Sequence, residues 1–271
     1  MIKYNVLIRV CDKVESVHRA KRPFGYNKIE TIKLCFESLY LSLKGCDHRI
    51  VVIGDDLSIE TLNFFKKYKN IEVLNENFGS ASLSLKKQLD IASEIPKDEW
   101  VYLCEDDYFH DIHAFEYLSE LINNRYTYLK TSKKKKNLYS ILSGDLSMKP
   151  LIIHLSDYPD RYLPHWIRPS YIFLSKFCHW RQIINTTHTL LLESKTLNKF
   201  IKEFYLSSIG PSDSKLSEKV YGKIFFINKA LCLSPIKGLS THFTEDVLTP
   251  QVDWEKLSKN TAKGLKDKGL L

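Results

Sequence analysis

The sequence predicts an α/β fold in which a mostly parallel sheet is flanked by helices and followed by a C-terminal helical appendage. The first observation is that short apolar runs alternate with longer stretches in which apolar residues recur at helical spacing, as in βαβ units. The second is composition. A chain of 271 residues with 44% hydrophobic residues can fill a sizeable core, and 27% charged residues without a fixed-period repeat argue against a disordered chain or a solenoid.

Local patterns in the first half of the chain predict each element in turn. Asn27 followed by Glu30 is typical of a capping box at the start of a helix, and Ser58 is suited to cap another helix. Apolar runs of strand length separate these helical patterns. The expected strands cover residues 4–10, 50–53, 71–74 and 100–104, and the expected helices cover residues 27–43, a stretch after Ser58, residues 80–94 and a stretch from Asp111.

The second half of the chain has weaker patterns. Residues 125–180 contain a polar, lysine-rich loop and then an aromatic segment interrupted by prolines. Helical spacing returns at residues 194–206 and 212–221, and a strand is expected at residues 223–227. The tail from Asp253 is predicted to be a basic helix.

Cysteine spacing and hydropathy predict a cytoplasmic protein. The six cysteines are scattered, with no CxxC pair and no spacing suited to a zinc knuckle. The opening residues lack the pattern of a signal peptide, and no stretch approaches the ~20 apolar residues of a membrane span. The N-glycosylation pattern at Asn185 is therefore interpreted as a chance match.

The formal charge of +8 favours anionic partners without choosing among nucleic acid, an anionic membrane and nucleotide phosphates. The densest basic cluster, Lys133–Lys136, is interpreted as a solvated loop, with contact to a membrane surface or an anionic acceptor as the minority interpretation. A second basic stretch follows the first strand, where a solvated loop is slightly favoured over a grip on phosphates. It comprises Lys13, Arg19, Lys21 and Arg22.

Acidic residues follow two of the predicted strands. Asp55 and Asp56 come after the second strand, and Glu105, Asp106 and Asp107 come after the fourth. Ligands of open α/β sheets bind beyond the carboxyl ends of the strands. Three adjacent carboxylates repel one another, and a hard divalent cation such as Mg²⁺ or Mn²⁺ would relieve that repulsion. The alternative is a structural role at the start of the next helix.

The segment WVYLCEDDYF resembles the DxD-type metal motif of GT-A glycosyltransferases, and the order of strands around it is similar to that of family 2 members. The resemblance implies that Asp107 binds Mn²⁺ or Mg²⁺ while Glu105 and Asp106 face the ribose and the donor sugar. It further implies that Asp55 contacts the nucleoside, with Asp56 as an equally placed rival.

Two further segments extend the resemblance. Asn77-Phe78-Gly79 is similar to the Asn-x-Gly start of the family's loop before the third helix, although the usual Arg-Asn continuation is absent. By this resemblance Lys86 is assigned to the diphosphate, with Lys87 as a rival. The stretch GPSDSKLSEKVYG resembles the segment in which inverting members carry the catalytic base, and its matching carboxylate is Asp213. A role restricted to the N-terminus of the helix is weighed equally for this residue.

The segment GLSTHFTED contains the last candidate ligand. His242 matches the late histidine that many GT-A enzymes add to the metal shell, and a strand ending there beside the acidic strand would bring it to Asp107. Glu245 and Asp246 remain rivals of Asp213 for the role of base.

The resemblance to GT-A glycosyltransferases implies a metal-dependent, inverting glycosyltransferase of glycan biosynthesis. It would move a sugar from a UDP-, GDP- or dTDP-linked donor to a hydroxyl of a glycan or glycolipid, with no nucleic-acid partner and at most peripheral contact with the inner membrane face. A single domain would span residues 1–250, with the donor at residues 1–124, the acceptor at 125–250 and a helical tail at 251–271. The alternatives are a nonenzymatic protein that binds nucleic acid or a membrane, and a nucleotidyltransferase. The absence of a glycine-rich phosphate loop disfavours the latter.

Overall fold

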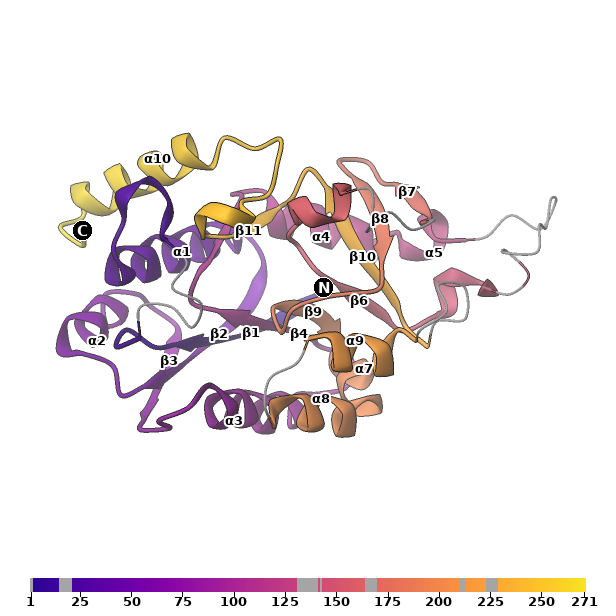
Figure 1. Ribbon diagram of the computed structural model, residues 1–271, viewed down its shortest axis with the longest axis horizontal. Coiled ribbons are helices and arrows are strands. Elements are labelled where there is room, and N and C mark those ends of the chain that lie inside the picture. The colour runs from indigo at the N-terminus through magenta and orange to yellow at the C-terminus, as the bar shows by residue number, and fades with distance from the viewer. Residues whose placement is uncertain are drawn as a thin grey trace.

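The structure is a computed structural model that describes residues 2–14, 21–130, 141, 143–163, 170–209, 213–222 and 229–271. These residues form a nine-stranded mixed sheet with helices on both faces and a second, two-stranded sheet (Figure 1). The predicted α/β class, with flanking helices and a C-terminal helix, is confirmed. The expectations at Arg19, at Lys133–Lys136 and at residues 223–227 fall outside the described residues.

The strands of the large sheet lie in the order β3-β2-β1-β4-β9-β6-β10-β8-β7, and β11 pairs with β5 in the small sheet. Their bounds are β1 Lys3–Val10, β2 Asp47–Asp55, β3 Ile71–Glu76, β4 Trp100–Glu105, β5 Tyr108–His110, β6 Leu151–Ile153, β7 Ile172–Leu174, β8 His179–Ile183, β9 Leu190–Glu193, β10 Leu231–Ile236 and β11 Ser240–His242.

The α-helices flank this sheet. They are α1 Lys28–Ser42, α2 Ile59–Phe65, α3 Ala81–Ser93, α4 Ala114–Asn123, α5 Arg125–Tyr128, α7 Ser194–Lys199, α8 Ile201–Ser208, α9 Asp213–Val220 and α10 Trp254–Asp267. Short 3₁₀ turns are η1 Pro23–Gly25, η2 Leu146–Met148, η3 Pro159–Tyr162 and η5 Glu245–Val247.

The first half of the chain folds largely as its local patterns predict. Strands β3, β2, β1 and β4 are parallel neighbours. The capping box of α1 is present, because Asn27 Oδ1 accepts from Glu30 N and Glu30 Oε2 accepts from Asn27 N, both at 2.9 Å. Asp111 was expected to open α4, and this was wrong. The helix begins at Ala114, and Asp111 instead accepts a hydrogen bond from the backbone of His113 at 2.8 Å.

The second half departs from the sequence prediction. Strands β6 and β7 lie within residues 125–180, where no strand was expected, and β8 begins at His179 at the end of that range. Strand β9 lies antiparallel between β4 and β6, and β8 is antiparallel to β10, so the sheet is mixed. The helix expected at residues 194–206 is divided into α7 and α8, because Phe200 leaves the helical region at φ −112° and ψ 18°.

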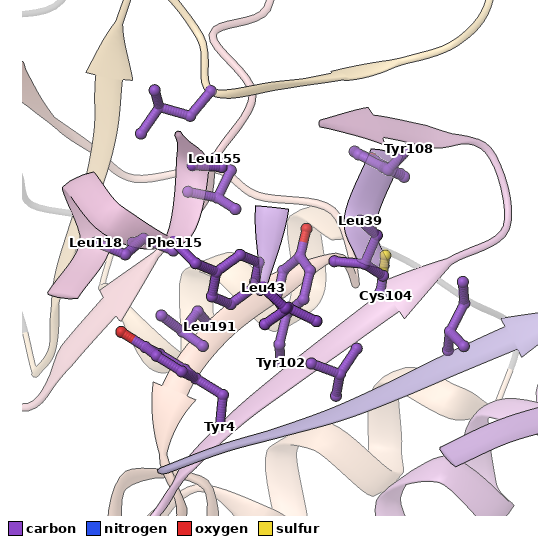
Figure 2. Close-up of a cluster of buried hydrophobic side chains, with 14 of the residues drawn as sticks. Tyr4, Leu39, Leu43, Tyr102, Cys104, Tyr108, Phe115, Leu118, Leu155 and Leu191 are labelled. Atoms are coloured by element: carbon purple, nitrogen blue, oxygen red, sulfur yellow. The ribbon is translucent and has the colours of Figure 1, made fainter. Parts of the chain in front are cut away.

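Two hydrophobic cores cover the two faces of the large sheet. On β4, Tyr102 and Cys104 pack with α1 and α4, whereas Val101 and Leu103 pack with α3, α7, α8 and α9. This alternation follows from the two-residue period of a strand. Figure 2 shows the first core, where Phe115 of α4 lies beside Tyr102. Helix α10 runs along α1 on the same side (Figure 1). Because both faces of the large sheet are covered, the polar side chains of the candidate site lie at the ends of the strands.

Candidate active site

The acidic segment forms a tight turn between the large and the small sheet. Strand β4 ends at Glu105, Asp106 and Asp107 make the turn, and β5 begins at Tyr108. Strand β5 pairs with β11, so that Tyr108 lies opposite His242 in the register. The small sheet therefore brings a residue 135 positions later in the chain to the acidic turn.

Each of the three acidic side chains is paired with a different basic side chain. The pairs are Arg9 with Glu105 at 2.6 Å, Lys28 with Asp106 at 2.8 Å and Arg22 with Asp107 at 3.0 Å. Like-charge repulsion in the turn is therefore relieved within the chain. It follows that the acidic triplet alone does not demand a bound cation.

His242 contacts Asp107 directly. Its Nε2 lies 3.1 Å from Asp107 Oδ2, and its ring stacks on Tyr108 with centroids 5.1 Å apart and an interplanar angle of 4°. Because the stacking fixes the ring plane, the imidazole nitrogen is held toward the carboxylate. The sequence expectation that a strand ending at His242 reaches Asp107 matches this geometry, although the neighbouring strand is β5 and not β4.

The two residues shift each other's pKa. Burial opposes ionisation of Asp107, but His242, Lys28 and Arg22 outweigh it and hold the pKa of this carboxyl well below its usual range. Burial likewise disfavours the charged imidazole of His242, yet the charge and hydrogen bond of Asp107 prevail and raise its pKa. The pair therefore favours the charged form of both groups.

Asp107 Oδ2 and His242 Nε2 are donors of the types that Mn²⁺ accepts, and they converge on one point. Among the described residues, no group of three or more His, Cys, Asp and Glu side chains is placed to hold a metal. An ion held by this pair would have to displace the proton that His242 Nε2 shares with Asp107, and it would complete its shell with a substrate diphosphate and water. Arg22 contacts the same oxygen, so an ion at this point competes with a guanidinium.

Asp106 is tied into the scaffold. Its Oδ1 accepts from Lys28 Nζ at 2.8 Å and its Oδ2 from the backbone of Cys11 at 2.9 Å, and the residue is only 8% exposed. These bonds join the end of β1, the start of α1 and the acidic turn. Contact of Asp106 with the ribose or sugar stays a prediction, as does that of Glu105, which also accepts from Thr189 Oγ1 at 3.4 Å.

Asp55 and Asp56 differ in their surroundings. Asp55 Oδ1 accepts from the backbone of Phe78 at 2.8 Å and of Gly79 at 3.0 Å, where Gly79 has a φ of +63°. Asp55 thus holds the loop before α3, whose left-handed turn suits glycine. Asp56 pairs with Lys13 at an exposed position. Of the two rivals, Asp55 is therefore the one that holds the loop before α3, and contact of either residue with a nucleoside stays a prediction.

Three of the remaining candidates, Lys86, Glu245 and Asp246, lie at exposed positions. Lys86 is exposed on α3, and its rival Lys87 pairs with Glu76 at 2.9 Å. Glu245 and Asp246 are exposed on η5, shortly after His242. The backbone of Phe243, two residues before Glu245, donates to the carbonyl of Asp107 at 2.7 Å, so the acidic pair follows a segment that contacts the acidic turn.

Asp213 is the first residue of α9, and its side chain is 47% exposed. His188 Nδ1 lies 2.9 Å from Asp213 Oδ1, while His188 itself is buried. The neighbours of His188 reach the acidic turn. Thr187 Oγ1 is 3.0 Å from Tyr108 Oη, and Thr189 Oγ1 donates to Glu105. Residues 185–189, hereafter the threonine loop, therefore connect Asp213 to the acidic turn.

Sequence reasoning missed three kinds of contributor. Arg22 was interpreted as part of a solvated loop, but its side chain is 8% exposed and it pairs with Asp107. Lys28 and His188 were not singled out at all. The threonine loop carried one available signal, a cluster of hydroxyl and imidazole groups just before an apolar run, which an N-glycosylation match obscured. In the described part of the chain, no helix is long and apolar enough to span a membrane.

No family model and no curated protein matches the sequence. Among solved structures, the chain is similar to TarS 1-349 of S. aureus, with 14% identity, a TM-score of 0.48 and coverage of 86% of this chain and 58% of TarS 1-349. It is similar to HddC of Yersinia pseudotuberculosis, with 11% identity, a TM-score of 0.47 and coverage of 95% and 99%. It is also similar to the galactosyltransferase LgtC in complex with donor and acceptor sugar analogues, with 11% identity, a TM-score of 0.39 and coverage of 79% and 69%. The chain thus spans just over half the length of the TarS 1-349 chain.

Proposed function

We propose that this protein is a nucleotide-sugar-dependent transferase, and specifically a metal-dependent, inverting glycosyltransferase that acts on a hydroxyl of a glycan or glycolipid. One observation carries the proposal. A carboxylate and imidazole pair, Asp107 and His242, lies at the carboxyl end of β4, and the threonine loop links that turn to the exposed carboxylate of Asp213. Inverting sugar transfer requires two parts. One site binds the donor, and a base on the opposite side of the anomeric carbon takes the proton of the acceptor hydroxyl.

In this proposal the acidic turn binds the donor diphosphate. Asp107 and His242, with its imidazole neutral, would hold a divalent ion, and such an ion would supply Lewis-acid stabilisation of the departing diphosphate. Arg22 and Lys28 add fixed positive charge beside the same point, where negative charge develops as the bond to the sugar breaks. Asp55 keeps the loop before α3 in place for the nucleoside.

Asp213 acts on the acceptor. Its carboxylate takes the proton of the acceptor hydroxyl while that oxygen forms a bond to the anomeric carbon of the donor. The bond from that carbon to the diphosphate oxygen breaks, and the nucleoside diphosphate leaves with the electron pair. Its half-exposed position supports this role, because an incoming hydroxyl can reach it.

A binding screen tests the donor half of the proposal. UDP, GDP, dTDP and CMP are each titrated into the protein with and without Mn²⁺, by thermal shift and calorimetry. We expect one nucleoside diphosphate to bind and to raise the melting temperature of the protein, and to do so only when Mn²⁺ is present. Product analysis then separates the enzyme classes. Release of nucleoside diphosphate from a nucleotide sugar supports glycosyl transfer, whereas pyrophosphate release from a nucleoside triphosphate indicates nucleotidyl transfer.

Two variants separate donor binding from chemistry. Asp107→Asn should lose Mn²⁺-dependent nucleotide binding, because one ligand of the ion loses its charge. Asp213→Asn should bind the donor normally, while transfer falls by roughly 10² to 10⁴-fold, the usual worth of a general base. Asp98→Asn, at an exposed position away from the turn, is the matched control and should change neither.

Undiminished metal-dependent binding in Asp107→Asn contradicts the metal site. If transfer survives in Asp213→Asn but is lost in Asp246→Asn or Glu245→Gln, the base belongs to the exposed acidic pair on η5. The donor site then stands and only the assignment of the base is wrong.

A further inference from the structure

We propose that His188 is a positioning residue that orients Asp213 for proton abstraction, and that the threonine loop sets this base relative to the donor site. The inference rests on the proposed function, since it assigns a second residue to the same reaction. His188 was not among the site residues predicted from the sequence. The proposal comes from its two ring contacts and from the bonds of its neighbours.

His188 is held at both ring nitrogens. Nδ1 lies 2.9 Å from Asp213 Oδ1, and Nε2 lies 3.0 Å from Ser207 Oγ on α8. Because an ionised carboxylate only accepts hydrogen bonds, Nδ1 carries the hydrogen of the first contact. The imidazole is 5% exposed, so its orientation is set by the protein interior while Asp213 faces solvent.

Such an arrangement leaves one carboxylate oxygen for the acceptor. Asp213 begins a helix, and a half-exposed aspartate there can otherwise rotate toward the backbone of the first turn. The bond from His188 occupies Oδ1 and restrains this rotation. The same bond fixes the direction of Oδ2, which is left for the acceptor hydroxyl. A base that a buried partner already holds in place loses less orientational freedom when the acceptor binds.

The threonine loop extends this restraint to the donor site. Thr187 contacts Tyr108 at 3.0 Å and Thr189 contacts Glu105 at 3.4 Å, so both neighbours of His188 bind the acidic turn. On the other side, the backbone of Thr186 donates to Ser217 Oγ of α9 at 3.2 Å. The loop therefore joins α9, which carries the base, to the turn that carries Asp107.

A nucleophilic triad is the competing interpretation of the same three side chains. Ser207, His188 and Asp213 have the connectivity of a serine hydrolase. Ser207, however, is 3% exposed and its hydroxyl donates to the carbonyl of Phe204 at 2.7 Å. A substrate carbonyl cannot reach it. The exposed member is the carboxylate, which suits a base for an incoming hydroxyl.

Two near-isosteric variants separate the two ring contacts. His188→Asn places an amide nitrogen near the position of Nδ1 and can still donate to Asp213. His188→Gln reaches the position of Nε2, keeps the contact with Ser207 and loses the one with Asp213. Ser207→Ala removes only the Nε2 partner. Kinetics are measured on nucleotide-sugar transfer or, with no acceptor at hand, on hydrolysis of the nucleotide sugar.

His188→Gln should lower kcat by roughly 100-fold, the cost of a base misplaced by about 1 Å, with the KM for donor unchanged. His188→Asn and Ser207→Ala should stay within about threefold of wild type, because both keep the donor to Asp213. Wild-type kcat in His188→Gln overturns the proposal. So does an equal loss of kcat in the Asn and Gln variants, since that marks a structural role.

A double-mutant cycle keeps the test decisive if His188→Gln folds poorly. When His188 acts through Asp213, adding His188→Gln to Asp213→Asn should lower kcat no further. Multiplicative losses overturn the positioning role. If Asp213→Asn itself retains full transfer, the proposed base fails first. If Asp213→Asn loses transfer and His188→Gln does not, only the present inference fails.

Discussion

Asp107 lies between two positive groups that approach the same carboxylate oxygen. Arg22 Nη1 is 3.0 Å and His242 Nε2 is 3.1 Å from Oδ2. A metal ion and the Arg22 guanidinium cannot both be close to this oxygen without repelling each other. In the proposed metal site, Arg22 would therefore lower the affinity for a cation before any diphosphate is bound.

Arg22→Gln should tighten Mn²⁺ binding in the absence of nucleotide by about tenfold, roughly 1.4 kcal/mol, because it removes a buried positive charge from beside the ligand pair. Calorimetry or the paramagnetic signal of free Mn²⁺ measures the affinity directly. Lys21→Gln removes the same charge from the adjacent, exposed position and is the matched control. Equal Mn²⁺ affinities in the two variants, or weaker binding in Arg22→Gln, would show that Arg22 does not compete with Mn²⁺ for Asp107 Oδ2.

At the level of elements, helix α1 both starts from a local signal and supplies a residue to the site. Its capping box satisfies backbone groups at Asn27 and Glu30. The first helical residue, Lys28, reaches Asp106 at 2.8 Å. The start of the helix is thus coupled to the anchoring of the acidic turn.

Asn27→Ala should lower the free energy of unfolding by about 1 kcal/mol, the usual worth of an N-cap. Urea denaturation measures the change. Asn27→Ser should recover most of the loss, because a serine hydroxyl can accept the same bond. Asn123→Ala, at an exposed position near the end of α4, serves as the control and should shift stability by less than about 0.5 kcal/mol. An unstable Asn27→Ser variant would argue that packing around residue 27, and not the cap, carries the effect.

At the level of the whole molecule, two histidine side chains are buried in the protein interior. Burial lowers the pKa of His110 and of His154 to about 3 each. His110 lies 2.8 Å from the Tyr102 hydroxyl, and His154 Nδ1 lies 2.8 Å from the carbonyl of Thr189. Both rings are therefore neutral in the folded protein at ordinary pH.

These histidines make the fold sensitive to acid. An unfolded histidine protonates near pH 6.5 while the folded ring does not, so stability is complete above that pH and declines as the pH falls toward the folded-state pKa. Each ring should contribute a slope of about 1.4 kcal/mol per pH unit in this window. Comparison of unfolding free energies at pH 7 and pH 5 should show a shallower decline in His154→Asn, which keeps a donor for Thr189.

His113→Asn is the control for this measurement, because His113 is exposed on α4's N-terminal side and its replacement should leave the acid slope unchanged. An unaltered slope in His154→Asn would mean that residue 154 is protonated in both states or in neither.

Local sequence signals were enough to predict the starts of α1 and α2 and the buried strands β1, β2 and β4. Asn27 with Glu30, and Ser58 with Thr61, satisfy backbone groups within one turn, so their residue types alone indicate where the helices begin. The apolar runs of β1, β2 and β4 are buried on both faces, so their continuous hydrophobicity predicts strands without knowledge of their neighbours. The placement of the acidic triplet at a strand end follows from the same runs.

Contacts between distant segments were decided only by the tertiary structure. Strand β9 lies between β4 and β6 through antiparallel pairing, and no local pattern specifies which strand it joins. The residue types of Arg22 and His188 do not reveal whether the side chain is solvated or buried against a carboxylate, and only the tertiary packing distinguishes the two cases. In the first half of the chain, sequence thus determined where segments become helix or strand, because those choices depend on neighbours within a few residues. The charge balance around Asp107 depends on residues 85 and 135 positions away. The link from the threonine loop to the acidic turn depends on contacts between residues 79 and 84 positions apart, and only the folded chain brings these residues together.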